Sequence, residues 1–329
     1  MLTFNNKVIT RNDKWVIKPI DPYNPLNLPS NIVRVRTSDG RAPYMNSTGG
    51  TSYTSATKVA GTTDVYDVYK TGTSFQHMFY YSTNVVEVLG ANATGITDMN
   101  CMFMHCTSLE SVAIFDTSNV TNMGGMFYDC PALAAVPLFD TSNVTDMVGM
   151  FMGCSSLTTV PLFDTSSITN MGSMFQGCSS LTSVPLFDTS KVTTMEDMFW
   201  NCTSLPTVPL FDTSNVTLAM RMFYKCSSLT TVPLFNTSKV TNMEAMLREC
   251  TSLTNIPLFN TSKVRYMNYM CLKCYKVESG ALALYQQLSS QTTPPYSHYD
   301  SFMDCGRDTT TGAAELAQIP SDWGGTLST

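Results

Sequence analysis

The stretch LFDTSNVTDMVGMFMGC, residues 138–154, is followed by SSLTTVP and then begins again as LFDTSSITNMGSMFQGC. Its phenylalanine recurs every 24 residues without an insertion, seven times between Phe115 and Phe259. A cysteine keeps the same spacing eight times, from Cys106 to Cys274, and a weaker copy precedes them at Met78-Phe79, with Ser82 in the cysteine position. A rigid period of this length is typical of one supersecondary unit stacked on itself, so the sequence predicts a solenoid.

Two hydrophobic patterns alternate within each unit. Leu157, Val160 and Leu162 predict a short extended segment that points its apolar side chains inward. The second pattern has the spacing of one helix face, about three turns long: Val144, Met147, Met150, Phe151 and Cys154. Between them, Asp140-Thr141-Ser142 is a helix-capping signal. The predicted fold is an α/β solenoid of 24-residue coils, each with a short strand and a helix, with the Met and Phe side chains as its core.

Six prolines fall inside the predicted strands: Pro137, Pro161, Pro185, Pro209, Pro233 and Pro257. Proline has no N–H to donate to a neighbouring strand, so it removes a hydrogen bond from the sheet. We therefore expect these strands to be very short or interrupted.

The pattern Leu157-x-x-Val160-x-Leu162, followed by Met174-Phe175-x-x-Cys178, recurs from about residue 78 to residue 274. It resembles the leucine-rich repeats of BspA-like surface proteins, also described as the Treponema pallidum type, whose coil carries L-x-x-I-x-L and later A-F-x-x-C. The resemblance implies a leucine-rich-repeat-like fold that works by binding and attaches to host or neighbouring-cell surfaces.

Three regions are expected along the chain. Residues 1–75 share none of the repeat pattern and predict a small β-rich arm or docking module, with a proline-rich extended segment at 20–31 and a hairpin over 31–45 that turns at Asp39-Gly40. Residues 76–274 form the solenoid. Residues 275–329 are expected to cap it as an enlarged final coil, with a helix over 279–290, a further Phe-x-x-Cys step at 302–305, a strand-like step at 316–320 and Trp323 covering the end.

Composition and charge argue against several partners. The net charge of −6 and a pI near 5.0 argue against a nucleic-acid partner. The only short basic feature, Arg34 and Arg36, is interpreted as a solvated strand face. The first residues lack the apolar core of a signal peptide, and no segment is apolar over the length of a membrane span, so we expect neither classical export nor membrane insertion.

Metal sites are the main alternative for the cysteines and the aspartates. Cys271-x-x-Cys274 is the one CxxC motif, but no second pair accompanies it, and one cysteine per coil favours a small buried apolar residue. The aspartate series could be a calcium stack, but it continues as Asn236 and Asn260, which capping tolerates and a carboxylate site does not: Asp116, Asp140, Asp164, Asp188 and Asp212. We expect no metal and no cofactor.

The sequence gives no sign of catalysis. His77, His105 and His298 lie in no recognisable nucleophile motif, and no glycine-rich phosphate loop is present. A glycan hydrolase is disfavoured, since carboxylates pair only as repeated caps. We therefore predict that the chain is not an enzyme.

The positions that change from coil to coil are the candidate binding residues. They form one outer stripe: Tyr128, Met152, Gln176, Trp200, Tyr224 and Arg248. Trp, Tyr and Arg are favoured as interface anchors, although drift at unconstrained surface positions explains the same variation. A second variable series lies four residues earlier, from Gly124 to Glu244.

The first functional hypothesis is a virion-displayed phage fibre, spike or decoration protein, assembled in the host cytoplasm, docked to other virion proteins through residues 1–75 and binding a host surface protein or glycan. It rests on the free cysteines and on a resemblance of both ends of the chain to proteins of gut-bacterial phages and prophages. The alternative is a BspA-like adhesin on a bacterial cell surface. Self-association of the chain is left open.

Overall fold

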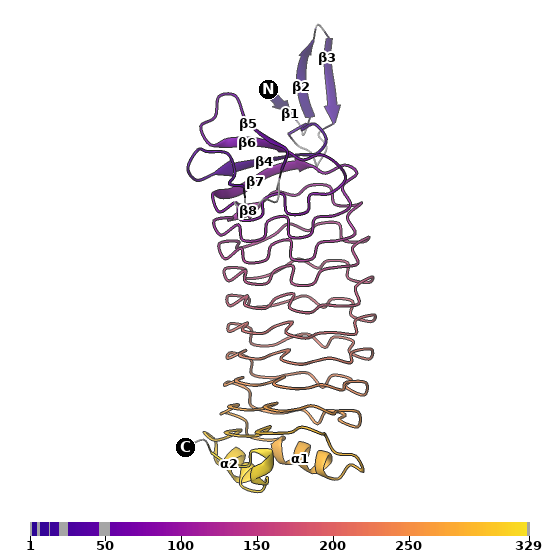
Figure 1. Cartoon of the computed structure of the whole chain (residues 1–329), viewed down its shortest axis with the longest axis vertical. Coiled ribbons are helices and arrows are strands. Elements are labelled where there is room, and N and C mark those ends of the chain that lie inside the picture. Colours follow the sequence, from indigo (N-terminus) through magenta and orange to yellow (C-terminus); the bar gives the residue numbers. More distant parts are fainter. Residues whose placement is uncertain (1, 5–6, 13, 20–25, 46–52, 328–329) are drawn as a thin grey trace.

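The computed structural model describes residues 2–4, 7–12, 14–19, 26–45 and 53–327. It is a repeat solenoid: flat coils stack along the long axis, with β-sheets at the N-terminal end and two helices at the C-terminal end (Figure 1). Successive coils meet through single parallel bridges between residues 24 apart, such as Asp98–Asn122 and Asn122–Asp146. The proline-rich segment predicted at 20–31 lies partly outside the described residues.

The predicted helix in each coil is wrong, because the chain forms consecutive tight turns there. In the coil of residues 147–154, Gly149 and Gly153 have φ values of 61° and 77°, which no right-handed helix accommodates. The Met150 N–H donates within the coil to Met147 O at 3.1 Å, whereas the Phe151 N–H donates to Met174 O of the next coil at 3.0 Å. Alternate N–H groups thus find partners in the neighbouring coil, which a helix would not allow.

The expectation of interrupted strands is confirmed. The coils that carry proline form no strand among the described residues, whereas the short strand β8 (Ser111–Val112) lies in the coil that carries Ala113 at the proline position. The Ala113 N–H donates to Val88 O at 2.8 Å, a bond that proline cannot make. The inward orientation predicted for Leu162 is wrong: Leu157 and Val160 are buried, but Leu162 is 60% exposed.

The N-terminal region contains two sheets. β1 (Leu2–Phe4), β2 (Lys7–Asn12) and β3 (Lys14–Pro19) form an antiparallel sheet. The second sheet has the order β5-β6-β4-β7-β8 and includes β8. Its other strands are β4 (Ile32–Thr37), β5 (Ser55–Lys58), β6 (Val65–Tyr69) and β7 (Val85–Asn92).

The hairpin predicted over 31–45 is also wrong. The chain turns after β4, but β4 pairs with β6 and β7 and not with residues 41–45. Nearly the whole length of β4 is hydrogen-bonded to each of these two strands. Arg34 and Arg36 form ion pairs with Asp67 and Glu87, at 2.6 and 3.2 Å, so both arginines are engaged within this sheet.

The core is a set of columns, each made of one residue per coil. Phenylalanine rings from Phe79 to Phe223 stack with centroids 5.2–5.8 Å apart, and a second column runs from Phe115 to Phe259. The methionines at Met147 and Met150 and their equivalents are buried beside them, as the sequence predicts. Each buried ring contributes about 1.5–3 kcal/mol, so the period itself stabilises the stack.

The C-terminal end closes the solenoid. α1 (Ala281–Ser289) confirms the helix predicted over 279–290, and α2 (Thr310–Leu316) follows. Residues 297–303 form one more coil on residues 266–273, for example through Cys271 N–H to Ser301 O at 2.8 Å. Leu316 ends α2 instead of beginning a strand-like step. Trp323, in the 3₁₀ helix Ser321–Trp323, is buried and stacks on His298 with ring centroids 3.8 Å apart.

Candidate functional site

One surface of the solenoid carries much of its sequence variation. In the coil of residues 147–154, Val148-Gly149 and Met152-Gly153 flank the buried pair Met150-Phe151. We call these two pairs and their equivalents, from residues 100–105 to residues 268–273, the variable face. The six predicted stripe residues all lie on it, each half-buried: Tyr128, Met152, Gln176, Trp200, Tyr224 and Arg248.

The tight turns explain why this surface can vary. The second residue of each pair has a positive φ throughout the variable face, for example 59° at Asp197 and 53° at Arg221. The backbone N–H of that residue bonds to the next coil, as Gly149 N–H does to Gly172 O at 3.0 Å. The backbone therefore fixes the turn, and the side chains at these positions are not needed for it.

The C-terminal half of the variable face holds an aromatic and arginine cluster. The rings of Trp200 and Tyr224 stack with centroids 5.4 Å apart. The Arg221 guanidinium lies 5.4 Å from the Trp200 ring centroid. Arg248 lies between two rings, 5.1 Å from that of Tyr224 and 5.3 Å from that of Tyr269. We call this set the aromatic–arginine cluster: Trp200, Arg221, Tyr224, Arg248 and Tyr269.

Ion pairs hold the arginines of the cluster in place. Arg221 donates two hydrogen bonds to the Asp197 carboxylate, at 2.6 and 2.8 Å, and lies 3.3 Å from Glu196. The bond to Asp197 raises the pKa of Arg221 above its ordinary value, so the guanidinium stays charged. Arg248 pairs with Glu249 at 3.3 Å. The arginines are thereby oriented before any ligand arrives, which reduces the entropy lost on binding.

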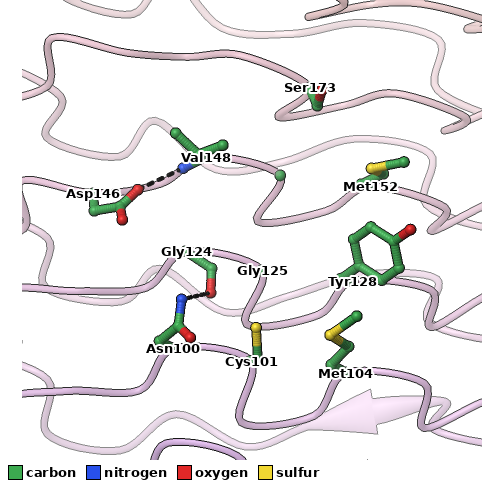
Figure 2. A pocket seen from close by; sticks show the side chains of 11 residues that line it. Asn100, Cys101, Met104, Gly124, Gly125, Tyr128, Asp146, Val148, Met152 and Ser173 are labelled. Atoms are coloured by element: carbon green, nitrogen blue, oxygen red, sulfur yellow. Dashed lines mark hydrogen bonds between the residues drawn. The ribbon is translucent and has the colours of Figure 1, made fainter.

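The N-terminal half of the same face is hollowed by a shallow depression of about 350 Å³ (Figure 2). Met104, Tyr128 and Met152 line one side, and Val148 and Asp146 another. The hollow exists because Gly124, Gly125 and Gly149 carry no side chain there. A Cβ on Gly125 would lie 3.0 Å from Cys101 Sγ. The depression is mostly apolar and suits a small apolar side chain of a partner.

A second aromatic group borders this depression. His105 Nδ1 lies 2.8 Å from Asp129 Oδ2, and the imidazole stacks on Tyr81 with centroids 4.3 Å apart. Tyr128 contacts the edge of the same imidazole at 5.4 Å. Stacking on Tyr81 and the contact with Asp129 hold the imidazole of His105 in place on the surface of the solenoid.

The aspartate series forms caps of turns. Asp140 Oδ1 accepts from the Ser142 N–H at 3.0 Å. Asn236 and Asn260 accept the equivalent hydrogen bonds through Oδ1 at 3.2 and 3.1 Å, so an amide oxygen caps the turn as a carboxylate oxygen does. No group of three or more metal-ligating side chains converges within the part of the chain that the structure describes.

The cysteines form a buried column that joins the coils. Each S–H donates to a backbone carbonyl of the preceding coil, as Cys154 does to Phe127 O at 3.1 Å. Burial raises the pKa of the Cys154 thiol to about 12, so it stays protonated and keeps its donor. All eleven cysteines are free, and Cys101 alone is half-buried, on the variable face. The column therefore adds hydrogen bonds to the apolar role predicted from the sequence.

Several residues of the cluster escaped prediction. Arg221 and Tyr269 of the cluster, and Asp197 that pairs with Arg221, occupy the second position of the earlier variable pair, between the two series that the sequence singled out. That position was also variable, which was the available signal. The expected helix placed it on another face, whereas the tight turns bring it alongside Trp200 and Tyr224.

Comparisons with known proteins agree with a repeat protein. A family model described as "Mycoplasma protein of unknown function, DUF285" matches four overlapping segments: residues 52–134, 73–184, 129–235 and 182–283. No curated protein matches the sequence significantly. Among solved structures, a leucine-rich repeat protein from Eubacterium ventriosum is similar at 21% identity over 62% of this chain and 43% of that one, with a TM-score of 0.34. The chain thus spans less than half of that protein. Within the described residues, no helix is long and apolar enough to cross a bilayer.

Proposed function

We infer that this chain, which belongs to the family described as mycoplasma proteins of unknown function, DUF285, is a binding protein whose variable face recognises a partner on a cell surface. The repeats are of the BspA-like leucine-rich-repeat type. The observation that carries the proposal is the aromatic–arginine cluster: pre-oriented Trp, Tyr and Arg side chains on a frame that is otherwise constant from coil to coil.

The composition of the cluster favours a protein partner. Trp, Tyr and Arg are the residue types enriched among the side chains that dominate protein–protein binding energy. Glu196, Glu249 and Lys225 border the cluster with both signs of charge, which is typical of a polar rim. The shallow depression, about four coils away, supplies a second, apolar contact.

The proposed role needs no catalysis. The repeated carboxylates are engaged with backbone N–H groups of their own turns. Burial raises the pKa of the column cysteines, which keeps them from acting as thiolates. A binding role uses the side chains of the variable face as the structure presents them.

The proposed carrier is a bacterial cell. The BspA-like type of the repeats, which is typical of bacterial surface proteins, supports the cell-surface adhesin over the virion-displayed fibre. Mass spectrometry of purified cell envelopes and of purified phage particles from a producing culture tests this. Enrichment in envelopes supports the adhesin, and enrichment in particles overturns it in favour of the fibre.

The test of the binding face is attachment of the purified chain to a panel of bacterial and epithelial cells. Trp200→Ala/Tyr224→Ala should weaken attachment by roughly 10- to 100-fold, as loss of two anchors does. Tyr296→Ala is the matched control, because Tyr296 is 80% exposed and lies outside the variable face. Equal attachment of both variants, with circular dichroism unchanged, contradicts the proposal.

Enzymatic treatment of the cells distinguishes a protein partner from a glycan. Protease treatment should abolish attachment, whereas glycosidase treatment should leave it. The opposite result would retain the binding face and replace the protein partner by a glycan.

A further inference from the structure

A column of leucines lies exposed on another surface of the solenoid. Six consecutive coils each present one leucine that is 53–64% exposed: Leu138, Leu162, Leu186, Leu210, Leu234 and Leu258. We call these six residues the leucine column. Ile114 precedes it at 38% exposure, and Leu282 of α1 follows it, partly packed against the core.

A tight turn points each leucine outward. The Phe163 N–H donates to Pro161 O at 3.0 Å, which makes Leu162 the central residue of a three-residue turn. The buried side chains on either side are Val160 and Phe163. The turn therefore places the Leu162 side chain in solvent, where the core gains nothing from its apolar character.

Exposed leucines are unremarkable singly, but here they are contiguous. Neighbouring outward positions in the same coils hold Thr158 and Thr159, so a polar residue fits this surface. Adjacent coils stack at the spacing of β-strands, about 4.8 Å, and six leucines at that spacing form one apolar stripe. Contiguous apolar stripes on a soluble protein mark interaction surfaces.

The two flanks of the column differ in charge. On the side toward the carboxyl end of the coil lie exposed aspartates in four coils, Asp140, Asp164, Asp188 and Asp212, and exposed asparagines in the last two, Asn236 and Asn260. Hydrogen bonds from Ser166 and its equivalents lower the pKa of Asp164, Asp188 and Asp212, so these carboxylates are charged at neutral pH. On the other side lie uncharged hydroxyl side chains such as Thr159 and Ser183.

We propose that the leucine column is the interface of a parallel two-fold homodimer. A partner that covers the whole stripe must present apolar groups at the spacing of the coils, and a second copy of this chain has that spacing by construction. A two-fold axis along the stack places Asp164, Asp188 and Asp212 opposite hydroxyl side chains of the second copy, where carboxylate and hydroxyl can form hydrogen bonds. An antiparallel pair would place Asp188 opposite Asp212 in the central coils, where like charges would repel, whereas Asp140 and Asp164 would face Asn260 and Asn236.

The leucines alone do not provide enough buried area for a stable dimer interface. A stable interface buries about 800 Å² of each partner, so the half-exposed prolines and the threonines beside the column must take part. This interface leaves the variable face free, so the dimer does not depend on the proposed cell-surface function. A two-fold axis along the stack turns the two variable faces in opposite directions, so the dimer leaves both open to separate partners.

Sedimentation velocity of the full chain tests the dimer. The wild-type protein should be a dimer in the micromolar range, and Leu186→Ser/Leu210→Ser should weaken dimerisation by at least about tenfold. Val148→Ser is the control, because Val148 is an exposed apolar residue of the variable face. A monomeric wild type, or a dimer that the leucine substitutions leave intact, would overturn the proposal.

Disulfide cross-linking tests the orientation, in a Cys101→Ser background that removes the one half-buried thiol. In a parallel dimer each leucine faces its own copy, so Leu162→Cys and Leu234→Cys should each form cross-linked homodimers under mild oxidation. The two cysteine variants are also mixed, with one of them carrying a size tag, so that a cross-link between Leu162→Cys and Leu234→Cys chains can be told apart from a cross-link between identical chains. Cross-links found only between the Leu162→Cys and Leu234→Cys chains would show an antiparallel pair and overturn the parallel arrangement.

Discussion

Replacing Arg221 by methionine should lower the free energy of unfolding by about 2 kcal/mol. Arg221 donates two hydrogen bonds to the Asp197 carboxylate, at 2.6 and 2.8 Å. The side chain of Asp197 is only 10% exposed, so water cannot replace the guanidinium well. A buried charge left alone costs about 3–5 kcal/mol, and the 33% exposure of Arg221 reduces that figure through solvent screening.

The substitution of the partner should be much milder. Asp197→Asn removes the charge and retains a residue that tolerates the φ of 59° at this position. Arg221 then keeps Glu196 and solvent, so we expect a loss below about 1 kcal/mol. The double variant should resemble Asp197→Asn alone, because it contains no unpaired buried charge.

Urea unfolding followed by circular dichroism measures the three free energies. Native-state hydrogen exchange at the amides of Asp197 and Arg221 measures the same coils locally, since a solenoid need not unfold in one step. Equal losses for the two single variants, or a double variant as unstable as Arg221→Met, would refute the argument that burial of Asp197 makes the pair asymmetric.

Two further predictions concern the thiols and the turns. A thiol reagent should label Cys101 first in the native protein, because the other cysteines are buried. Burial and the nearby Asp98 and Asp146 raise the pKa of Cys101, so the labelling rate should keep rising above the pH at which free cysteine has ionised. A labelling rate that reaches its plateau at that pH would contradict this. Gly177→Ala should lower the free energy of unfolding in urea by about 1 kcal/mol, because of its φ of 76° alone. Gly153→Ala should lower it further, because the new Cβ would lie 3.1 Å from Asp129 Cα. Equal losses for the two variants would show that φ alone sets the loss of stability.

The solenoid and its core could be predicted because they depend on local repetition. Burial of Met147, Phe151 and Cys154 follows from their recurrence, whatever the backbone between them does. The prediction of a helix failed because i, i+3, i+7 spacing is shared by consecutive turns whose alternate N–H groups bond to the next coil. Such bonds join residues 23 apart and leave no mark on local periodicity. The glycines at these positions, Gly125, Gly149, Gly153 and Gly177, were the available sign of left-handed backbone.

The candidate site was predicted as a column, and its internal contacts were not. Variation alone identified Trp200, Tyr224 and Arg248. Their ion pairs and stacking depend on the angle between coils and on the turn that aims each side chain, which no one-dimensional pattern contains. For the same reason the outward leucines were placed in the core: L-x-x-V-x-L has strand spacing, and the three-residue turn that breaks it depends on the Pro161 carbonyl.

The left-handed positions separate drift from selection on the variable face. A residue other than glycine at φ near +60° costs about 1–2 kcal/mol, so unconstrained drift should favour glycine there. Gly125, Gly149, Gly153 and Gly177 follow that expectation, whereas Ser173 and, nearer the N-terminus, Cys101, His105 and Asp129 do not. The C-terminal coils do not: such positions hold larger side chains with φ between 51° and 62°, namely Asp197, Asn201, Arg221, Lys225, Ala245, Glu249, Tyr269 and Lys273.

Several of these strained residues contact the aromatic–arginine cluster directly. Arg221 and Lys225 lie over Trp200 and Tyr224, and Tyr269 lies beside Arg248. Backbone strain retained at eight successive left-handed positions of the C-terminal coils favours a role for these side chains beyond the turn itself. The stacking of the coils does not require these larger side chains, since glycine forms the same turn. The strain therefore supports the proposal that recognition, and not drift alone, explains the variation in the C-terminal half of the variable face.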